Sequence, residues 1–585
     1  MMISLQMNKF LLPMKAHYFL FNAGTASVVP FMTVYAKQLR FSSVTVGIIY
    51  TILAIAGMLA KTIIGGVADK YQCKKVIFLS SIMATGLSFL LMNFSKSIPT
   101  QQKMRFACDY GSSVMDTCVN NFNITDECAV EMITSETAST VTCKLFCEIN
   151  NQIRNTVCNS WNVTEYCKEN STELLSFSAD ISMRHTEKLG DCVIFRIDSV
   201  QFANRQVLYP YCPRDNSIQT VCDIDCDSFA VNDLVRVPTI KMSYVYSTDS
   251  FWVLLTFFSL TWISQAVVVS IGDAICFEML GDKPNKYGYQ RLWGALGWGI
   301  LSVLAGYLID FSSEGLGYKN YTPVFVLGFI ILLINFINSY FIKYQQRHIS
   351  SNLLQDISMV VTNLRVVVFM FWCTFVGMCT GLVWHFLLWF IEDLAKVRGC
   401  DSHEWIKTLQ GLIMGIQCLF GELPFFFLSG WILKRIGHVN TMSLILLAIG
   451  VRFTLYSFIS NPWWFLPIEI MNGPTFGLSY ATMASYASIA APPGTEATMQ
   501  GLVGAVFEGV GVSLGSFLGG VLFQSYGGAI AFRILGMTAF IMSLVHAGAA
   551  FWLAKCDVRG KDMFARYAAP QDALQMVESR QDVVQ

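Results

Sequence analysis

Hydrophobic residues occur along this chain in long, nearly continuous runs, and polar residues interrupt them only at intervals. An α-helix needs about twenty apolar residues to cross a hydrocarbon core of about 30 Å, and the runs reach that length repeatedly. A backbone in lipid has no water to bond, so each run must be helical. The pattern predicts twelve transmembrane helices, at 14–37, 43–68, 75–94, 248–279, 289–310, 322–344, 363–392, 405–433, 440–460, 463–489, 498–526 and 529–555.

Short sequence patterns recur six helices apart. The end of predicted helix 2 reads G-G-V-A-D-K at 65–70, and the end of helix 8 reads G-W-I-L-K-R at 430–435. Helices 5 and 11 begin with Q-R-L-W-G-A at 290–295 and Q-G-L-V-G-A at 500–505. Two halves related as parallel repeats are a known transporter architecture, in which the solute binds between the halves.

The predicted fold is an all-α membrane protein with two six-helix halves and one large polar insert after helix 3. The expected parts are a first half in two pieces, the insert, a connector, a second half and a tail, at 1–94 with 248–344, 95–247, 345–362, 363–555 and 556–585.

Composition and charge support a membrane protein and give its orientation. Charged residues make up only 14% of the chain, whereas a soluble protein carries about 25%. The formal net charge of zero gives no reason to expect nucleic acid as a partner. Most Lys and Arg residues of the short loops fall on one side, which predicts that this side and both termini are cytosolic. Lys37 and Arg40 fall on the other side.

The insert is predicted to be extracytoplasmic. It holds eleven cysteines, and dense cysteine with N-glycosylation acceptors indicates an oxidising compartment. A bridge from Cys400 and one unpaired thiol in the insert are equally open explanations of the odd number. Two C-x-x-x-C motifs suggest zinc, but only His185 lies nearby, so no metal is expected. The predicted glycosylation sites are Asn123, Asn162 and Asn170 in the insert and Asn320 after helix 5.

Several motifs resemble those of one transporter superfamily. Gly65, Asp69 and Lys70 fit loosely the loop motif G-x-x-x-D-R/K-x-G-R-K of the major facilitator superfamily, which gives this loop a gating role. The second half resembles the major facilitator superfamily domain-containing protein 6 family, in the lactose-permease-like branch. The segments that carry this likeness read E-L-P-F-F-F-L-S-G-W, N-P-W-W and A-P-P-G-T-E-A-T-M-Q-G, at 422–431, 461–464 and 491–501.

Charged residues inside the predicted helices are candidates for the solute site, because a charge at mid-bilayer costs several kcal/mol unless it pairs or lines water. Asp273 in helix 4 and Arg291 in helix 5 lie on neighbouring helices. In lactose permease, a carboxylate and an arginine with the same spacing bind the sugar, and a tryptophan placed like Trp298 stacks on it. The resemblance therefore implies that these three residues bind the solute. The alternative is an ion pair that serves packing only.

The second half offers four more intramembrane charges. Glu422 and Arg452 resemble charged residues of lactose permease and are predicted to bind the solute. Proton-coupling candidates are Glu422, Glu469 and Glu508, because buried carboxylates are protonated more readily. The alternative is that Glu422 and Glu469 pair with Arg452 only for structure.

Three further positions bear on this site. Asn472 and Thr475 stand where the permease has its coupling histidine and glutamate, so the chain departs from that relay. His385 in helix 7 is predicted to line the cavity, and a packed histidine is the alternative.

The predicted function is secondary active transport of a small polar solute, sugar-like or nucleoside-like, with protons as the candidate coupling ion. No nucleotide-binding loop or enzyme motif occurs in a suitable context, and no cofactor is expected. The expected location is the plasma membrane, with the lipid bilayer as partner. The alternative is a cell-surface receptor or adhesion protein whose insert binds an extracellular protein ligand.

Overall fold

The computed structural model describes most of the chain, including all segments that carry the predicted site. The described residues are 10–98, 103–118, 140–149, 151–163, 167, 175–189, 192–203, 205–213, 217–228, 231, 242–280, 287–314, 316, 318–343, 364–397, 401–491 and 496–557. Asn123, Asn170 and Cys400, with their predicted glycosylation and bridging, lie outside them.

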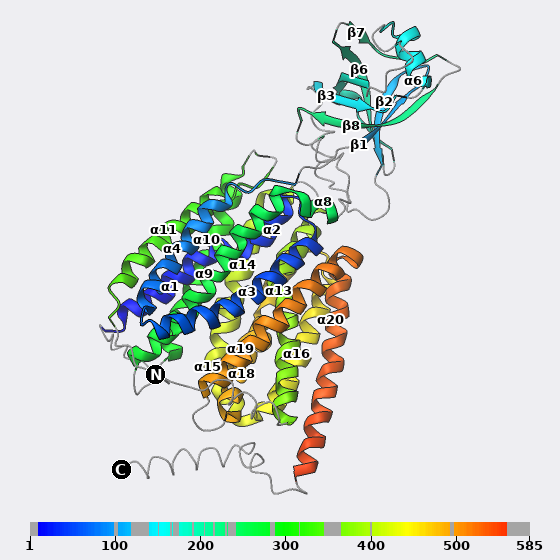
Figure 1. Cartoon of the computed structure of the whole chain (residues 1–585). Helices are drawn as coiled ribbons and strands as arrows, with labels where there is room; N and C mark the ends of the chain where they lie inside the picture. The colour runs from blue at the N-terminus through cyan, green and yellow to red at the C-terminus, as the bar shows by residue number, and fades with distance from the viewer. Residues whose placement is uncertain are drawn as a thin grey trace, which may run out of the picture.

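The helical part is a bundle of long helices (Figure 1). Its first part comprises α1 (Leu12–Ala26), α2 (Met32–Gln38), α3 (Ser43–Lys70), α4 (Lys74–Met92), α9 (Asp249–Leu280), α10 (Tyr287–Ser312) and α11 (Thr322–Tyr340). Its second part comprises α13 (Leu364–Lys396), α14 (Asp401–Ile416), α15 (Leu423–Ile436), α16 (His438–Phe458), α17 (Phe465–Ile468), α18 (Leu478–Ala490), α19 (Glu496–Gly504) and α20 (Ser513–Asp557).

Ten helices in the described part of the chain are long and apolar enough to cross a membrane. The last of them, Met499–Leu553, has 55 residues and contains Gly527 in a non-helical conformation (φ 77°, ψ 169°). Gly527 lies in the gap between the last two predicted helices, at 498–526 and 529–555. A residue other than glycine would be strained at this φ, which explains why the chain bends here.

The predicted continuous helix at 463–489 was wrong in detail. This segment consists of short helical pieces, with a 3₁₀ turn at Glu469–Met471 and a π-helical turn at Gly473–Gly477 before α18. Gly473 and Pro474 explain the break, because proline lacks the N–H that an α-helix needs and glycine weakens a helix interior.

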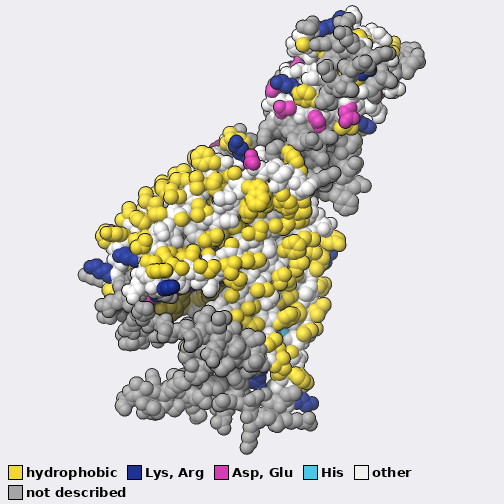
Figure 2. Space-filling view, viewed as in Figure 1, with side chains coloured by type: hydrophobic (Ala, Val, Ile, Leu, Met, Phe, Trp, Pro, Cys, Tyr) yellow, Lys and Arg dark blue, Asp and Glu magenta, His cyan; other side chains and the backbone are white. Residues whose placement is uncertain are grey.

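The two ends of the bundle differ in what they carry. We call the end where α4 finishes and α9 begins the insert end, because the insert connects these helices. The opposite end, where α20 finishes, we call the tail end (Figure 1). Hydrophobic side chains cover the sides of the bundle between the two ends, and charged side chains are grouped beyond them (Figure 2). This surface suits helices that lie in lipid, so the protein is a multi-pass membrane protein.

Two helix crossings bring backbones into direct contact towards the insert end. α10 crosses α14 at Gly306, where an added Cβ would lie 2.1 Å from the carbonyl oxygen of Lys407. α3 crosses α20 at Gly47, where an added Cβ would lie 2.5 Å from the carbonyl oxygen of Ser516. Towards the tail end, a Cβ added at any of several helix glycines would meet no atom within 4 Å, namely Gly65, Gly66, Gly288, Gly430, Gly501 and Gly504.

The insert contains a small antiparallel β-barrel, which the sequence analysis did not predict and which corrects the all-α assignment. Its strands are β1 (Lys103–Cys108), β2 (Ser113–Cys118), β3 (Thr140–Cys147), β4 (Leu175–Ser182), β5 (Glu187–Leu189), β6 (Cys192–Phe202), β7 (Arg205–Leu208) and β8 (Ile218–Cys226). The pairing order is β2-β1-β8-β3-β4-β6, and β6 also pairs with β2, so six strands form a closed ring. β3 alternates buried and exposed residues, as expected for a strand with one face in a core.

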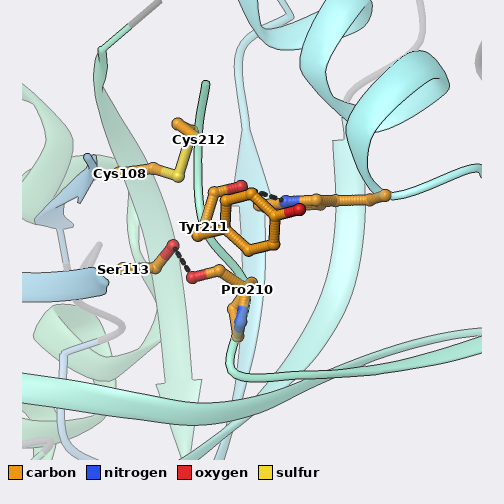
Figure 3. Close-up of a disulfide and its surroundings, with 6 residues drawn as sticks. Cys108, Ser113, Pro210, Tyr211 and Cys212 are labelled. Atoms are coloured by element: carbon orange, nitrogen blue, oxygen red, sulfur yellow. Dashed lines mark hydrogen bonds between the residues drawn. A yellow bond between two sulfur atoms is a disulfide. The ribbon is translucent and has the colours of Figure 1, made fainter. Parts of the chain in front are cut away.

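Four disulfides whose two cysteines both lie in the described residues hold the barrel and its loops, and Cys192 is disulfide-bonded as well. The two C-x-x-x-C motifs lie opposite each other on β3 and β8 and form Cys143–Cys226 and Cys147–Cys222. The other two are Cys108–Cys212 and Cys158–Cys167. Near Cys108–Cys212, the hydroxyl of Ser113 donates a hydrogen bond to the carbonyl oxygen of Pro210 at 2.8 Å (Figure 3).

Non-reducing peptide mapping should recover these four pairs from the purified protein. The strand register sets the expectation, because Cys143 faces Cys226 and Cys147 faces Cys222 across β3 and β8. A peptide that joins Cys143 to Cys222 would contradict this register. The same digest tests the predicted bridge from Cys400, since an unmodified Cys400 peptide would exclude it.

Candidate functional site

The first charged cluster joins α1, α9 and α10. Arg291 Nη1 donates to Asp273 Oδ2 at 2.7 Å, and the pair crosses from α10 to α9 as the sequence predicted. The hydroxyl of Tyr18 donates to Asp273 Oδ1 at 2.7 Å. Arg291 Nη1 also donates to the hydroxyl of Tyr287 at 2.6 Å. Both oxygens of this carboxylate are therefore engaged.

Arg291 also faces the second half of the chain. Its side chain is 40% exposed, and its guanidinium carbon lies 5.9 Å from the ring centre of Tyr480 in α18. Nε and Nη2 of Arg291 have no hydrogen-bond partner among the described residues. Trp298 follows seven residues later on the same helix face and is half-buried. Arg291 thus has N–H groups available between the helices.

The second charged cluster is centred on Arg452 in α16, which is 2% exposed. Its guanidinium donates to the fully buried carboxylate of Glu469. Arg452 Nη1 also donates to Asn472 Oδ1 at 2.8 Å and to Thr475 Oγ1 at 2.7 Å. Asn472 and Thr475, the positions that depart from lactose permease, therefore hold this arginine.

Glu469 is fully satisfied by hydrogen bonds. Its Oε1 accepts from the hydroxyl of Tyr456, and its Oε2 accepts from Gln417 Nε2 at 2.7 Å as well as from Arg452. Tyr456 in turn accepts a hydrogen bond from Arg452 Nε at 2.6 Å. This ring of contacts is what a buried ion pair needs to offset the cost of desolvation.

Glu422 has far fewer partners than Glu469. Its Oε1 accepts one hydrogen bond, from Asn472 Nδ2 at 2.9 Å, and the described residues offer it no further hydrogen bond. The carboxylate still interacts electrostatically with Arg452 and with Arg291. Glu422 is therefore not paired with Arg452, contrary to the structural alternative for this residue.

π-helical turns carry all three candidate carboxylates of the second half, or lie next to them. Glu422 ends the turn η6 (Gln417–Glu422), and Glu508 lies inside η10 (Ala505–Val512). Glu469 is followed within a few residues by η9 (Gly473–Gly477). Such turns are rare and occur frequently at functional sites. The sequence analysis did not predict them.

Aromatic side chains run beside these two clusters. The rings of Trp384 and Phe476 lie 5.8 Å apart, and those of Phe476 and Tyr480 lie 6.2 Å apart. We call these three residues the aromatic row. Trp384 and Phe476 also line a cavity of about 20 Å³ together with Arg452, Asn472 and Thr475. This volume is room for about one water molecule.

The other predicted site residues lie apart from these clusters. His385 is 2% exposed, its ring stacks on Tyr50 at 4.0 Å, and its Nδ1 lies 2.8 Å from the hydroxyl of Ser516. Glu508 forms an ion pair with Lys61 of α3. The structure thus places His385 in a packed position and outside the lining of the cavity.

The predicted gating loop and two glycosylation sites lie in the described residues. Gly65 and Lys70 belong to the last turns of α3 at the tail end, together with Asp69. Asn162 is exposed in the insert, where its φ is 54°. Asn320 is half-buried near the insert end, and its Oδ1 accepts from the backbone N–H of Thr322 at 3.1 Å. Their predicted roles stay predictions.

The sequence analysis did not predict a third cluster of charged residues, which lies at the insert end. Lys37 at the end of α2 pairs with Asp393 of α13 at 2.5 Å and lies 3.4 Å from Glu392. Glu392 is also paired with Lys407 of α14. These contacts join both parts of the bundle and explain why a lysine is found on the side with few positive charges.

Asp310 at the insert end of α10 extends this cluster. It accepts from Lys319 Nζ at 2.7 Å, and from the backbone N–H and hydroxyl of Thr408 at 2.6 and 2.7 Å. We call this set the insert-end lock, which consists of Lys37, Asp310, Lys319, Glu392, Asp393, Lys407 and Thr408. All of its charged side chains are at least three-quarters buried.

Several known proteins resemble this chain in sequence. The major facilitator superfamily domain-containing protein 6-like protein B of Xenopus laevis is 25% identical over 278 residues, which cover 46% of this chain and 43% of that protein. The maltose permease of Geobacillus stearothermophilus is 24% identical over 269 residues, which cover 45% of this chain and 62% of the permease. This chain thus matches less than half of the Xenopus protein.

Solved structures show the same fold at low sequence identity. The nucleoside transporter NupG aligns with a TM-score of 0.55 at 13% identity, over 92% of this chain and 98% of NupG. Tetrameric PepTSo2 aligns with a TM-score of 0.51 at 9% identity, over 93% of this chain and 98% of that chain.

The resemblance to the major facilitator superfamily is confirmed, and these relatives give no support to the receptor alternative. They point to a transporter family rather than to an enzyme. The model of the MFS_1 like family matches residues 11–534, and the chain therefore belongs to the MFS_1 like family.

Proposed function

We propose that this protein is a secondary active transporter that moves a small polar solute, sugar-like or nucleoside-like, by alternating access. One observation carries the proposal. The two charged clusters lie on different helices within the membrane, and the aromatic row connects them, since Arg291 faces Tyr480 and Arg452 shares a cavity with Phe476. Charges kept inside a bundle at high energetic cost are typical of solute pathways.

The proposed architecture has twelve crossings in two halves, at 1–94 with 248–344 and at 363–555. The helix Met499–Leu553 is divided at Gly527, and the pieces from α17 to α18 form a further crossing. The insert 95–247, the connector 345–362 and the tail 556–585 complete the chain. A solute site between such halves, near the midplane, is the arrangement that transporters of this kind share.

The proposed orientation has the tail end in the cytosol and the insert end outside the cell, with the plasma membrane as the location. The positive charges of the tail-end loops and the disulfides of the insert favour this orientation. The insert-end lock and the backbone contacts at Gly306 and Gly47 then close the outer side. In this proposal, a chain with these insert-end contacts is closed on the outer side, and the loop at Gly65 would close the other side in the opposite state of the cycle.

Among the three candidate carboxylates, Glu422 is the best proposal for proton coupling. Glu469 accepts three hydrogen bonds, one of them from the guanidinium of Arg452. Glu508 is paired with Lys61. Glu422 has one hydrogen bond and no ion pair among the described residues. A carboxylate in this position gains or loses a proton with the least disturbance to its surroundings.

The proposed solute class follows from the groups that line the site and is supported by the relatives. Guanidinium N–H groups and tyrosine hydroxyls bind hydroxyl groups, and aromatic faces bind apolar ring faces. The names of two similar proteins, a maltose permease and a nucleoside transporter, fit such a solute.

Replacement of the first charged pair tests the proposal. In cells that express the protein, we expect uptake of at least one labelled sugar or nucleoside at about pH 5.5 or 7.5. Asp273→Asn and Arg291→Ala should each lower uptake at least about tenfold, because each removes a charged hydrogen bond worth about 1.5–3 kcal/mol. Asp249→Asn, at the exposed start of the same helix, should transport like the wild type. Normal uptake by both pair variants would exclude this site.

A further inference from the structure

The central clusters hold one more negative charge than positive charges. Their carboxylates are Asp273, Glu422 and Glu469, and their guanidinium groups belong to Arg291 and Arg452. Asp273 pairs with Arg291 and Glu469 pairs with Arg452, so Glu422 is left over. An unbalanced carboxylate inside the bundle is costly, so a ligand with one positive charge would stabilise the site. From this we infer that the transported solute carries an ammonium group that binds to Glu422.

This inference rests on the proposed function and narrows it to amine-bearing polar solutes. The first support is the state of Glu422 itself. Only one of its oxygens accepts a hydrogen bond within the described residues, from Asn472. An ionised carboxylate accepts up to about four hydrogen bonds. An ammonium group offers three donors, which matches this free capacity better than a neutral hydroxyl does.

The aromatic row is the second support. Phe476 lies four residues from Asn472 in the sequence, and both line the same cavity, while Asn472 holds Glu422. Trp384 lies against Phe476 and is 40% exposed, so an aromatic face is accessible next to the cavity lined by Asn472, the hydrogen-bond partner of Glu422. A carboxylate together with aromatic faces is the chemistry that binds ammonium groups in proteins.

The third support is the difference between the two arginines. Arg452 is buried and fully engaged by its own half. Arg291 is neutralised by Asp273 and keeps Nε and Nη2 free for hydroxyl groups of the solute. A solute with hydroxyls at one end and an ammonium group at the other, such as an amino sugar, would contact both clusters.

Matched pairs of ligands test this inference on the purified full-length protein. The first pair is glucosamine and N-acetylglucosamine, and the second is ethanolamine and ethylene glycol, in which a hydroxyl replaces the ammonium group. We expect the charged member of at least one pair to bind at least about tenfold more tightly, which is about 1.4 kcal/mol. Glu422→Gln should abolish this preference. Glu404→Gln, an exposed glutamate at the start of α14, should keep it.

Every other result would overturn the inference. Equal binding of both members, a preference that persists in Glu422→Gln, or no binding of either pair would each do so. If neutral ligands bind as tightly as charged ones, and bind more tightly at about pH 5.5 than at 7.5 only when Glu422 is present, this carboxyl serves proton coupling alone and binds no ammonium group. The comparison within the wild type does not depend on any variant, and the uptake experiment decides separately whether the protein transports at all.

Discussion

Glu469→Ala is expected to destabilise the protein by about 3–5 kcal/mol. Glu469 is the one carboxylate of the described residues that pairs with Arg452, whose side chain is 3% exposed, so its removal leaves a buried positive charge without that counter-ion. The substitution also removes the acceptor for Tyr456 and Gln417. The measurement is thermal unfolding in detergent followed by size-exclusion chromatography, and we expect a marked loss of folded protein. Glu404→Ala, at an exposed position near the start of α14, is the matched control.

The double variant Arg452→Met with Glu469→Met separates structure from transport. Replacement of a buried ion pair by apolar residues of similar volume is often neutral for stability, so this protein should recover most of its folded yield. If uptake also recovers, the pair serves structure only, which is the alternative that the sequence left open. A double variant that folds but does not transport assigns the pair to solute binding. A stable Glu469→Ala single variant would contradict the buried ion pair itself.

The sequence predicted a bundle of apolar helices and the contact between Asp273 and Arg291 for physical reasons, although ten rather than twelve helices of the described residues are long and apolar enough to cross a membrane. Long apolar runs have few structural solutions in lipid, so their positions follow from hydropathy alone. Asp273 and Arg291 lie eighteen residues apart on consecutive helices, and a short connection forces such helices together. The pairing of Arg452 with Glu469 was considered only as an alternative, together with a pairing of Glu422 that the structure does not contain.

The β-barrel and the π-helical turns could not be predicted in the same way. Most strands of the insert are short, and many cysteines and charged residues lie within them, so alternation along each strand is a weak signal. A π-helical turn adds one residue to a helix without changing its apolar character. The contacts of Tyr18 with Asp273 and of Tyr480 with Arg291 could not be predicted from the sequence either. Tyrosines are common in this chain, and these two lie far from Arg291 in the sequence.

The insert-end lock could not be predicted from the charged residues of single helices. Lys37 and Asp393 are separated by 356 positions, and both lie at predicted helix ends, where charged residues are ordinary. The packing of α2 against α13, of α10 against α14 and of α13 against α14 brings the seven residues of the lock together. In the proposed transport cycle, these contacts would have to break before the insert end could open.

Gly306→Val is expected to lower uptake about 10- to 100-fold by preventing closure of the insert end. A Cβ at this position would lie 2.1 Å from the backbone oxygen of Lys407, roughly 1 Å too close, and a backbone atom cannot rotate away. Overpacking of this kind costs about 1–3 kcal/mol. It destabilises only the state in which α10 and α14 are in contact. Gly548→Val, on the exposed surface of α20, is the control, because nothing lies within 4 Å of a Cβ at this position.

Cysteine labelling distinguishes a failure to close from a failure to fold. Ser302 is fully buried beside Gly411 at the same crossing, so a cysteine placed there should resist an impermeant thiol reagent added from outside the cell. With Gly306→Val, we expect that Ser302→Cys becomes labelled, as located by peptide mass spectrometry, while the protein still reaches the membrane. Normal uptake together with an unlabelled cysteine would show that the α10–α14 contact does not govern access. Labelling without loss of uptake would show that closure of this end is not required for transport.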